Sequence, residues 1–142
     1  MTEISFHFNI ADGPAYACRL LRKAIRRGAR LAVTGSGDAL ARLDRELWGF
    51  DPVEFIPHVR LRQGEAADRL GVTPVQLVDD PADAGHHDVL VNLGGSTPVG
   101  FESYARLIEI VSTAESDRTA ARQRWRHYAD RGYPITKYEV SE

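Results

Sequence analysis

The sequence has a single cysteine, Cys18, and no apolar stretch that approaches the ~20 residues needed to cross a bilayer. A lone cysteine cannot form an internal disulfide, which favours a reducing compartment. The first ten residues also lack the basic segment and the apolar segment of a standard secretory signal. We therefore expect a cytoplasmic protein that does not associate with membranes.

Neither the length nor the composition departs from that of an ordinary globular domain. The chain has 142 residues, of which 43% are hydrophobic and 27% are charged. A domain of this length buries about two-thirds of the surface that its unfolded chain exposes, so it needs no metal or disulfide for stability. No internal repeat, low-complexity tract or linker interrupts the sequence. We expect one domain spanning residues 1–142.

The pattern of apolar residues predicts alternating strands and helices. Apolar and polar residues alternate over residues 3–10, which is typical of a half-buried strand. Further strands are predicted at 30–34, 75–78, 88–93 and 136–140. Helices are predicted at 14–27, 101–111 and 117–131, and another begins at a cap formed by Ser36 or Asp38. Residues 48–58 are predicted to form an extended loop that ends in a strand. This alternation predicts an α/β fold, a mostly parallel sheet with helices on both faces.

The chain lacks the Gly-Lys-Ser/Thr sequence of a phosphate-binding loop, whose lysine reaches the phosphates. Two glycine turns do follow predicted strands, where ligands bind in such sheets. One contains Gly35 and Gly37, and the other contains Gly94 and Gly95. Neither turn supplies a cation, so ordinary structural turns are the favoured interpretation. The alternative is a small nucleotide-binding or enzymatic α/β domain that uses one of them.

Other residues that could carry catalysis or hold a metal lie in patterns that have simpler explanations. Asp79 and Asp80 could hold a magnesium ion between them, but an Asp-Asp-Pro sequence is also common in turns and helix caps. His86 and His87 are adjacent, so they point in different directions, and we expect both on the surface of a turn. Cys18 lies among apolar residues of a predicted helix, as a buried thiol would. We therefore predict no catalytic site, no metal and no cofactor.

The charges are unevenly distributed, although the formal net charge of the chain is only -2. From residue 118 to the end there are six Lys or Arg and three Asp or Glu. Residues 1–117 hold 12 basic and 17 acidic residues. A basic C-terminal segment on a mildly acidic body predicts a localised anionic partner and argues against a protein that coats nucleic acid.

One face of the last predicted helix combines cations with an aromatic ring. Arg118, Arg122, Trp125 and Arg126 fall within about 100° of one another around a helix. Guanidinium groups bind carboxylates through two parallel hydrogen bonds, and an indole offers apolar contact, so this face suits a ligand with a carboxylate and an aromatic ring. The alternative is a solvated arginine face with Trp125 in the core. Arg124 projects about 200° away from Arg122 around the helix. We therefore expect Arg124→Ala to reduce affinity for such a ligand only by the loss of long-range attraction.

A second candidate surface lies in the segment of residues 48–58, where two prolines separate large apolar side chains. The segment contains Trp48, Phe50, Phe55 and Ile56. Half of such side chains would ordinarily be buried in the core. Four of them in one loop can also present an apolar patch to a partner protein.

The chain resembles the chi subunits of bacterial DNA polymerase III nearly from end to end. The most specific segments are LDRELWGFDPVEFIPH at residues 43–58 and RWRHYADRGY at residues 124–133. The segments FHFNI and DVLVNL agree in position and character. The resemblance implies a non-catalytic α/β protein, similar to nucleotide-binding domains but without their phosphate loop.

The resemblance also implies partners for the two candidate surfaces. Chi proteins link the clamp loader to single-stranded DNA-binding protein by holding its acidic C-terminal tail, which ends in Pro-Phe with a free carboxylate. The psi subunit of the clamp loader occupies the other surface, which matches Trp48 and Phe55. Strong direct DNA binding is not expected. The positions that match the tail-binding residues are Val111, Arg118, Arg122, Trp125 and Arg126.

Overall fold

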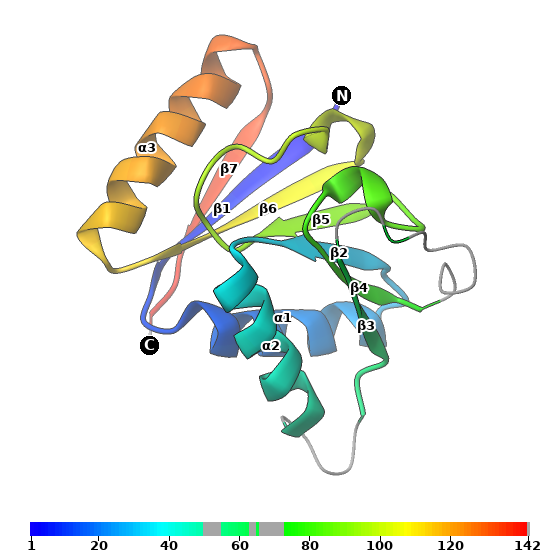
Figure 1. Ribbon diagram of the computed structural model, residues 1–142. Helices are drawn as coiled ribbons and strands as arrows, with labels where there is room; N and C mark the ends of the chain where they lie inside the picture. Colours follow the sequence, from blue (N-terminus) through cyan, green and yellow to red (C-terminus); the bar gives the residue numbers. More distant parts are fainter. Residues whose placement is uncertain (50–54, 63–64, 66–72, 142) are drawn as a thin grey trace.

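The computed structural model describes residues 1–49, 55–62, 65 and 73–141, which form seven strands and three α-helices (Figure 1). The strands are β1 (Glu3–Ile10), β2 (Leu31–Thr34), β3 (His58–Leu61), β4 (Val75–Val78), β5 (Val89–Asn92), β6 (Arg106–Ser112) and β7 (Ile135–Glu139). The helices are α1 (Gly13–Arg26), α2 (Gly37–Gly49) and α3 (Glu115–Asp130). Two short 3₁₀ helices, η1 (Pro81–Asp83) and η2 (Phe101–Ser103), precede β5 and β6.

The strands form one sheet in the order β3-β4-β2-β5-β6-β1-β7, and every neighbouring pair is parallel. Helices α1 and α2 lie on one face of this sheet, and α3 lies on the other (Figure 1). Strands β2 and β4 are buried throughout because both of their faces are covered. The predicted α/β fold with a parallel sheet between helices is confirmed.

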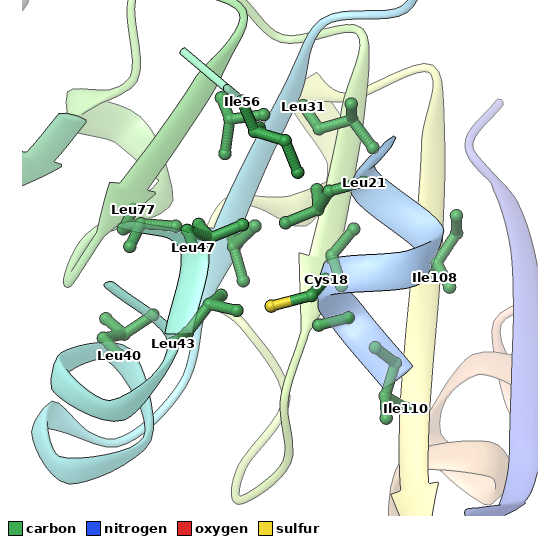
Figure 2. Packing of buried hydrophobic residues seen from close by; sticks show 14 of the residues in the cluster. Cys18, Leu21, Leu31, Leu40, Leu43, Leu47, Ile56, Leu77, Ile108 and Ile110 are labelled. Atoms are coloured by element: carbon green, nitrogen blue, oxygen red, sulfur yellow. The ribbon is translucent and has the colours of Figure 1, made fainter. Parts of the chain in front are cut away.

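Each face of the sheet has its own hydrophobic core. The larger core packs Leu21 of α1 and Leu43 of α2 against the inner strands, and Figure 2 shows it from close by. Cys18 lies within this core and is fully buried, as the sequence predicts. The opposite core joins Phe6 of β1 to Tyr128 of α3. Helix α3 is thus held on the sheet by aromatic contacts.

Local sequence signals set the ends of the first two helices. Pro14 lies in the first turn of α1, where its missing N–H is harmless, and Gly28 follows the end of α1 with φ of 79°. Ser36 Oγ accepts a hydrogen bond of 3.1 Å from the backbone N–H of Ala39. Ser36 is therefore the residue that caps α2, and Asp38 lies inside the helix.

The helix predicted over residues 101–111 is wrong. This segment contains η2 and then β6, which pairs with β5 on one side and with β1 on the other. Ile108, Ile110 and Val111 are β-branched, and all three are buried, as is typical of a central strand covered on both faces. The segment therefore supplies a strand between the two halves of the sheet.

None of the helices in the described part of the chain combines the length and the hydrophobicity that a membrane crossing requires.

Candidate functional site

A groove of about 490 Å³ runs between α3 and the strands β1 and β7. Its floor and walls come from elements far apart in the sequence, because β1 lies in the sheet between β6 and β7. The groove contains all five residues that the sequence predicts as a binding site. Its lining residues are Phe6, Phe8, Val111, Arg118, Ala121, Arg122, Trp125, Arg126, Ala129 and Lys137.

The three predicted arginines form one rim of this groove. Arg118, Arg122 and Arg126 lie four residues apart on α3, which spaces them by about 6 Å along the helix axis. All three are exposed. Arg122 Nη1 lies 3.5 Å from Glu115 Oε1, in an exposed ion pair. The rim therefore presents a row of cations to solvent above an apolar floor.

Trp125 joins the arginine rim to the floor. Its ring centroid lies 5.0 Å from that of Phe6, and the side chain is half-buried. Val111, at the carboxyl end of β6, is buried beside the same groove. Trp125 thus packs on the core and also lines the groove.

Five lining residues were missed from the sequence: Phe6, Phe8, Ala121, Ala129 and Lys137. Phe6 pairs with Lys137 in the register between β1 and β7, so their side chains lie on the same face of the sheet. The alternating pattern of residues 3–10 places Phe6 and Phe8 on one face, but it does not reveal which helix covers them. Long-range strand pairing brings Phe6, Phe8 and Lys137 to the site.

The sequence predicts that Arg124 contributes little to ligand binding, and the structure gives this residue a separate, structural role. The side chain points away from the groove, as predicted, but it enters the core beneath α3 and is only 3% exposed. Arg124 Nε donates to Glu109 Oε1 at 3.1 Å, and Nη1 donates to the carbonyl of Gly95 at 2.5 Å. Arg124 therefore ties α3 to the sheet and to the turn after β5.

Glu109 is the centre of this buried polar cluster. It lies on β6, is fully buried, and also accepts hydrogen bonds from Asn92 Nδ2 at 2.9 Å and from the Tyr128 hydroxyl at 2.5 Å. Burial raises the pKa of the Glu109 carboxyl, and the Arg124 guanidinium opposes that shift. Every oxygen of the carboxylate has a donor, so the cluster is structural and separate from the groove.

The second predicted surface is a small aromatic patch formed by Trp48, Phe55 and His58. Trp48 is 64% exposed and Phe55 is 55% exposed, with ring centroids 5.2 Å apart. His58 packs against both rings. Trp48 belongs to the last turn of α2 and not to the predicted loop, because the helix continues to Gly49. Phe50 lies outside the described residues.

Ile56, the fourth member of that segment, is a core residue. Its carbonyl faces His58 Nδ1 at 2.7 Å, and the other ring nitrogen of His58 lies 3.1 Å from Asp44 Oδ1 on α2. These contacts fix His58 beneath the two exposed rings. The two exposed rings thus pack on a buried histidine that contacts Ile56 and Asp44.

The two glycine turns line a cleft of about 840 Å³ at the carboxyl ends of β2, β4 and β5. Gly94 and Gly95 have φ of 124° and 90°, a backbone conformation that explains the glycines. The described lining residues include Asp79, Asp80 and Asp117 and no Lys or Arg. Asp79 is paired with Arg60, but Asp80 and Asp117 have no such cation among the described lining residues, and their charges disfavour a phosphate ligand. This argues against the nucleotide-binding alternative.

The remaining polar candidates have structural roles. Asp80 caps η1, and Asp79 pairs with Arg60 at 2.6 Å. His86 is buried, with Nε2 lying 3.0 Å from the carbonyl of Thr73, so its predicted position on the surface is wrong. His87 is half-buried and stacks on Tyr104. Within the described residues no group of three or more His, Cys, Asp or Glu side chains could hold a metal ion.

Solved structures with a similar fold include a helicase domain and a domain of a DEAD-box protein. The helicase domain of Pyrococcus furiosus Hef aligns with 80% of this chain and 28% of that chain, with a TM-score of 0.60 and 12% identity. The C-terminal domain of the DEAD-box protein Dbp5 aligns with 97% of this chain and 90% of that chain, with a TM-score of 0.59 and 8% identity. These identities are so low that the likeness concerns the fold alone.

Relatives found by sequence identify a family, which the likeness of fold alone does not. The family model described as "DNA polymerase III chi subunit, HolC" matches residues 1–136. The DNA polymerase III subunit chi of Pseudomonas aeruginosa is 30% identical over 145 residues, covering 99% of this chain and 98% of the relative. That of Haemophilus influenzae is 28% identical over 126 residues, covering 87% of this chain and 85% of the relative. With matches that span nearly the whole chain, the protein belongs to the DNA polymerase III chi subunit family.

Proposed function

We propose that this protein is a non-catalytic accessory subunit of DNA polymerase III that holds the acidic C-terminal tail of single-stranded DNA-binding protein. The groove between α3 and β1 carries the proposal, because it joins an apolar floor to a rim of three arginines. A tail that ends in Phe with a free carboxylate offers the matching groups, a ring for the floor and anions for the rim.

Arg122 is the central residue of the rim, with one arginine four residues before it and another four residues after it. In this proposal Arg122 binds the terminal carboxylate, and the Phe ring lies against Trp125 and Val111. Arg126 holds an acidic side chain of the tail, and Arg118 adds positive charge on the other side of Arg122. The guanidinium groups are exposed, so salt screens their charge and affinity for the tail should fall as the salt concentration rises.

The aromatic patch of Trp48, Phe55 and His58 is the proposed docking surface for the clamp loader, through the psi subunit or a functional substitute. Two large side chains that stay more than half exposed are typical of a protein interface. The patch includes the end of α2, whereas the groove lies beside α3 on the other face of the sheet. Separate surfaces would let one chain bridge two partners.

Direct binding of DNA as the main activity has weaker support. The rim of α3 offers only a few phosphate contacts, and the chain as a whole has a net charge of -2. Affinity for nucleic acid at physiological salt should therefore be poor.

The test is a titration of the protein with a synthetic peptide that copies the acidic tail, followed by fluorescence anisotropy. We expect micromolar affinity, about -8 kcal/mol at most, and weaker binding as salt rises from ~0.05 to ~0.5 M. A peptide without the terminal Phe should bind much more weakly. The proposed binding mode would be refuted if the complete peptide did not bind, or if its affinity did not change with salt concentration.

A matched titration with ATP, GTP and NAD tests the competing function at the glycine turns. A ligand present at 100 times its dissociation constant raises the free energy of unfolding by ~2.7 kcal/mol, which a thermal-shift assay detects. We expect no shift, because the cleft is lined by carboxylates. A shift with any of these nucleotides would favour the alternative.

A further inference from the structure

Strand β7 forms a second wall of the groove, opposite the arginine rim. In the register between β1 and β7, Phe6 pairs with Lys137 and Phe8 pairs with Glu139. Side chains at paired positions lie on the same face of a sheet, so Lys137 and Glu139 both face the side that α3 covers. Lys137 lines the main groove, and Glu139 lines a small hollow that continues it.

The charge along this second wall changes sign. Lys137 and Glu139 are two residues apart, which separates them by about 7 Å along the strand. The hollow beside Glu139 has a volume of about 120 Å³ and shares Phe8, Val111 and Arg118 with the main groove. The groove therefore has one end with cations on both walls and another end where a carboxylate faces Arg118.

Lys137 is available to a ligand. It is exposed, and among the described residues it has no ion-pair or hydrogen-bond partner. Its neighbours Thr136 and Tyr138 point to the opposite face, where the Tyr138 ring packs 5.1 Å from the ring of His7. The charge of Lys137 can therefore be moved to the other face by exchanging it with its neighbour.

We infer that Lys137 is a further specificity-determining residue, which binds an acidic side chain of the tail from the wall opposite Arg122 and Arg126. Glu139 repels acidic side chains from the other end and so sets the direction in which the tail lies. This inference rests on the proposed function. It adds a charged contact from β7 to a binding site whose other cations all lie on α3. An acidic segment that lies between two basic walls can make charge-assisted contacts on both sides.

The test uses two variants in the tail-peptide titration. Lys137→Thr removes the charge, and the double variant Thr136→Lys with Lys137→Thr keeps the net charge but moves the cation to the other face of β7. We expect both to weaken binding about three- to fivefold, the range of an exposed ion pair. A peptide with its acidic residues changed to amides should show the same affinity for both variants and the unchanged protein.

The outcomes separate the inference from the proposed function. If the unchanged protein does not bind the peptide, both fail. If it binds but Lys137→Thr has no effect, or if the double variant restores full affinity, only the inference fails, because the lysine then acts at most through long-range attraction. Thermal melts of each variant check that the fold is intact.

Glu139→Gln should strengthen binding of the acidic peptide, and a loss of affinity would contradict the direction assigned to the tail.

Discussion

The two faces of α3 each carry an arginine, and the two arginines have different roles. Arg122 has a side chain that is 60% exposed and lines a groove, whereas Arg124, two residues away, is 3% exposed and bonded to Glu109. One arginine is positioned for a ligand, and the other holds the helix on the sheet. The contrast teaches that position relative to the sheet, and not formal charge, decides what an arginine on this helix does.

The largest effect is expected from Arg124→Ala. Removing Arg124 leaves Glu109 as an unpaired buried carboxylate, which should lower the free energy of unfolding by about 3–5 kcal/mol. Urea denaturation followed by circular dichroism measures this loss. The double variant Arg124→Met with Glu109→Leu removes both charges and should be more stable than Arg124→Ala. A melt unchanged by Arg124→Ala would show that the buried pair contributes nothing to the fold.

Arg122→Ala should have the converse effect, on binding and not on stability. Loss of one charge-assisted contact costs about 1.5–3 kcal/mol, or roughly 10- to 150-fold in affinity for the tail peptide. Lys23→Ala is the matched control, because Lys23 is an exposed cation on α1, beyond the opposite face of the sheet. Equal losses for the two variants at ~0.15 M salt would mean that only the overall charge matters.

Trp48→Ala and Phe55→Ala extend the comparison to exposed aromatic side chains. Both side chains are more than half exposed, so we expect each variant to lower the free energy of unfolding by less than about 1 kcal/mol. Affinity for the tail peptide should not change, whereas capture of the clamp loader in a pull-down should be lost. Loss of the cooperative melt would place these rings in the core and remove the support for a second interface.

The smallest expected effect is a gain from Glu115→Gln. Glu115 lies 3.5 Å from Arg122 and is 73% exposed, so the pair is screened by solvent. Neutralising Glu115 frees Arg122 for the ligand and should strengthen peptide binding by about twofold, for a few tenths of a kcal/mol. Isothermal titration at low salt can resolve this change. Weaker binding would indicate that Glu115 orients Arg122 instead of competing for it.

Much of the fold could be predicted because local patterns and tertiary structure agree. The alternation over residues 3–10 and the proline and glycine around α1 each correspond to an element of the structure. The helical spacing of Arg118, Arg122, Trp125 and Arg126 likewise predicts that they share a face, and all four line one groove. These predictions depend only on residues close together in the sequence.

The errors arise where a distant contact decides the outcome. Glu109 interrupts the apolar run of β6, so the local pattern over this segment does not single out a strand. Its burial is tolerated because Arg124, Asn92 and Tyr128 supply donors from other elements. Nothing in the local sequence reveals that pairing. Lys137 was missed for the same reason, since only the register with β1 brings it to the groove.

The burial of Cys18 has a practical consequence for studying the groove. The thiol is fully enclosed by the larger core, and burial raises its pKa to about 11, so it stays protonated and inaccessible to alkylating reagents near neutral pH. A cysteine introduced at Ala129, which is exposed and lines the groove, would then be labelled selectively in the native protein. A fluorophore placed there would report occupancy of the groove without removal of the natural thiol.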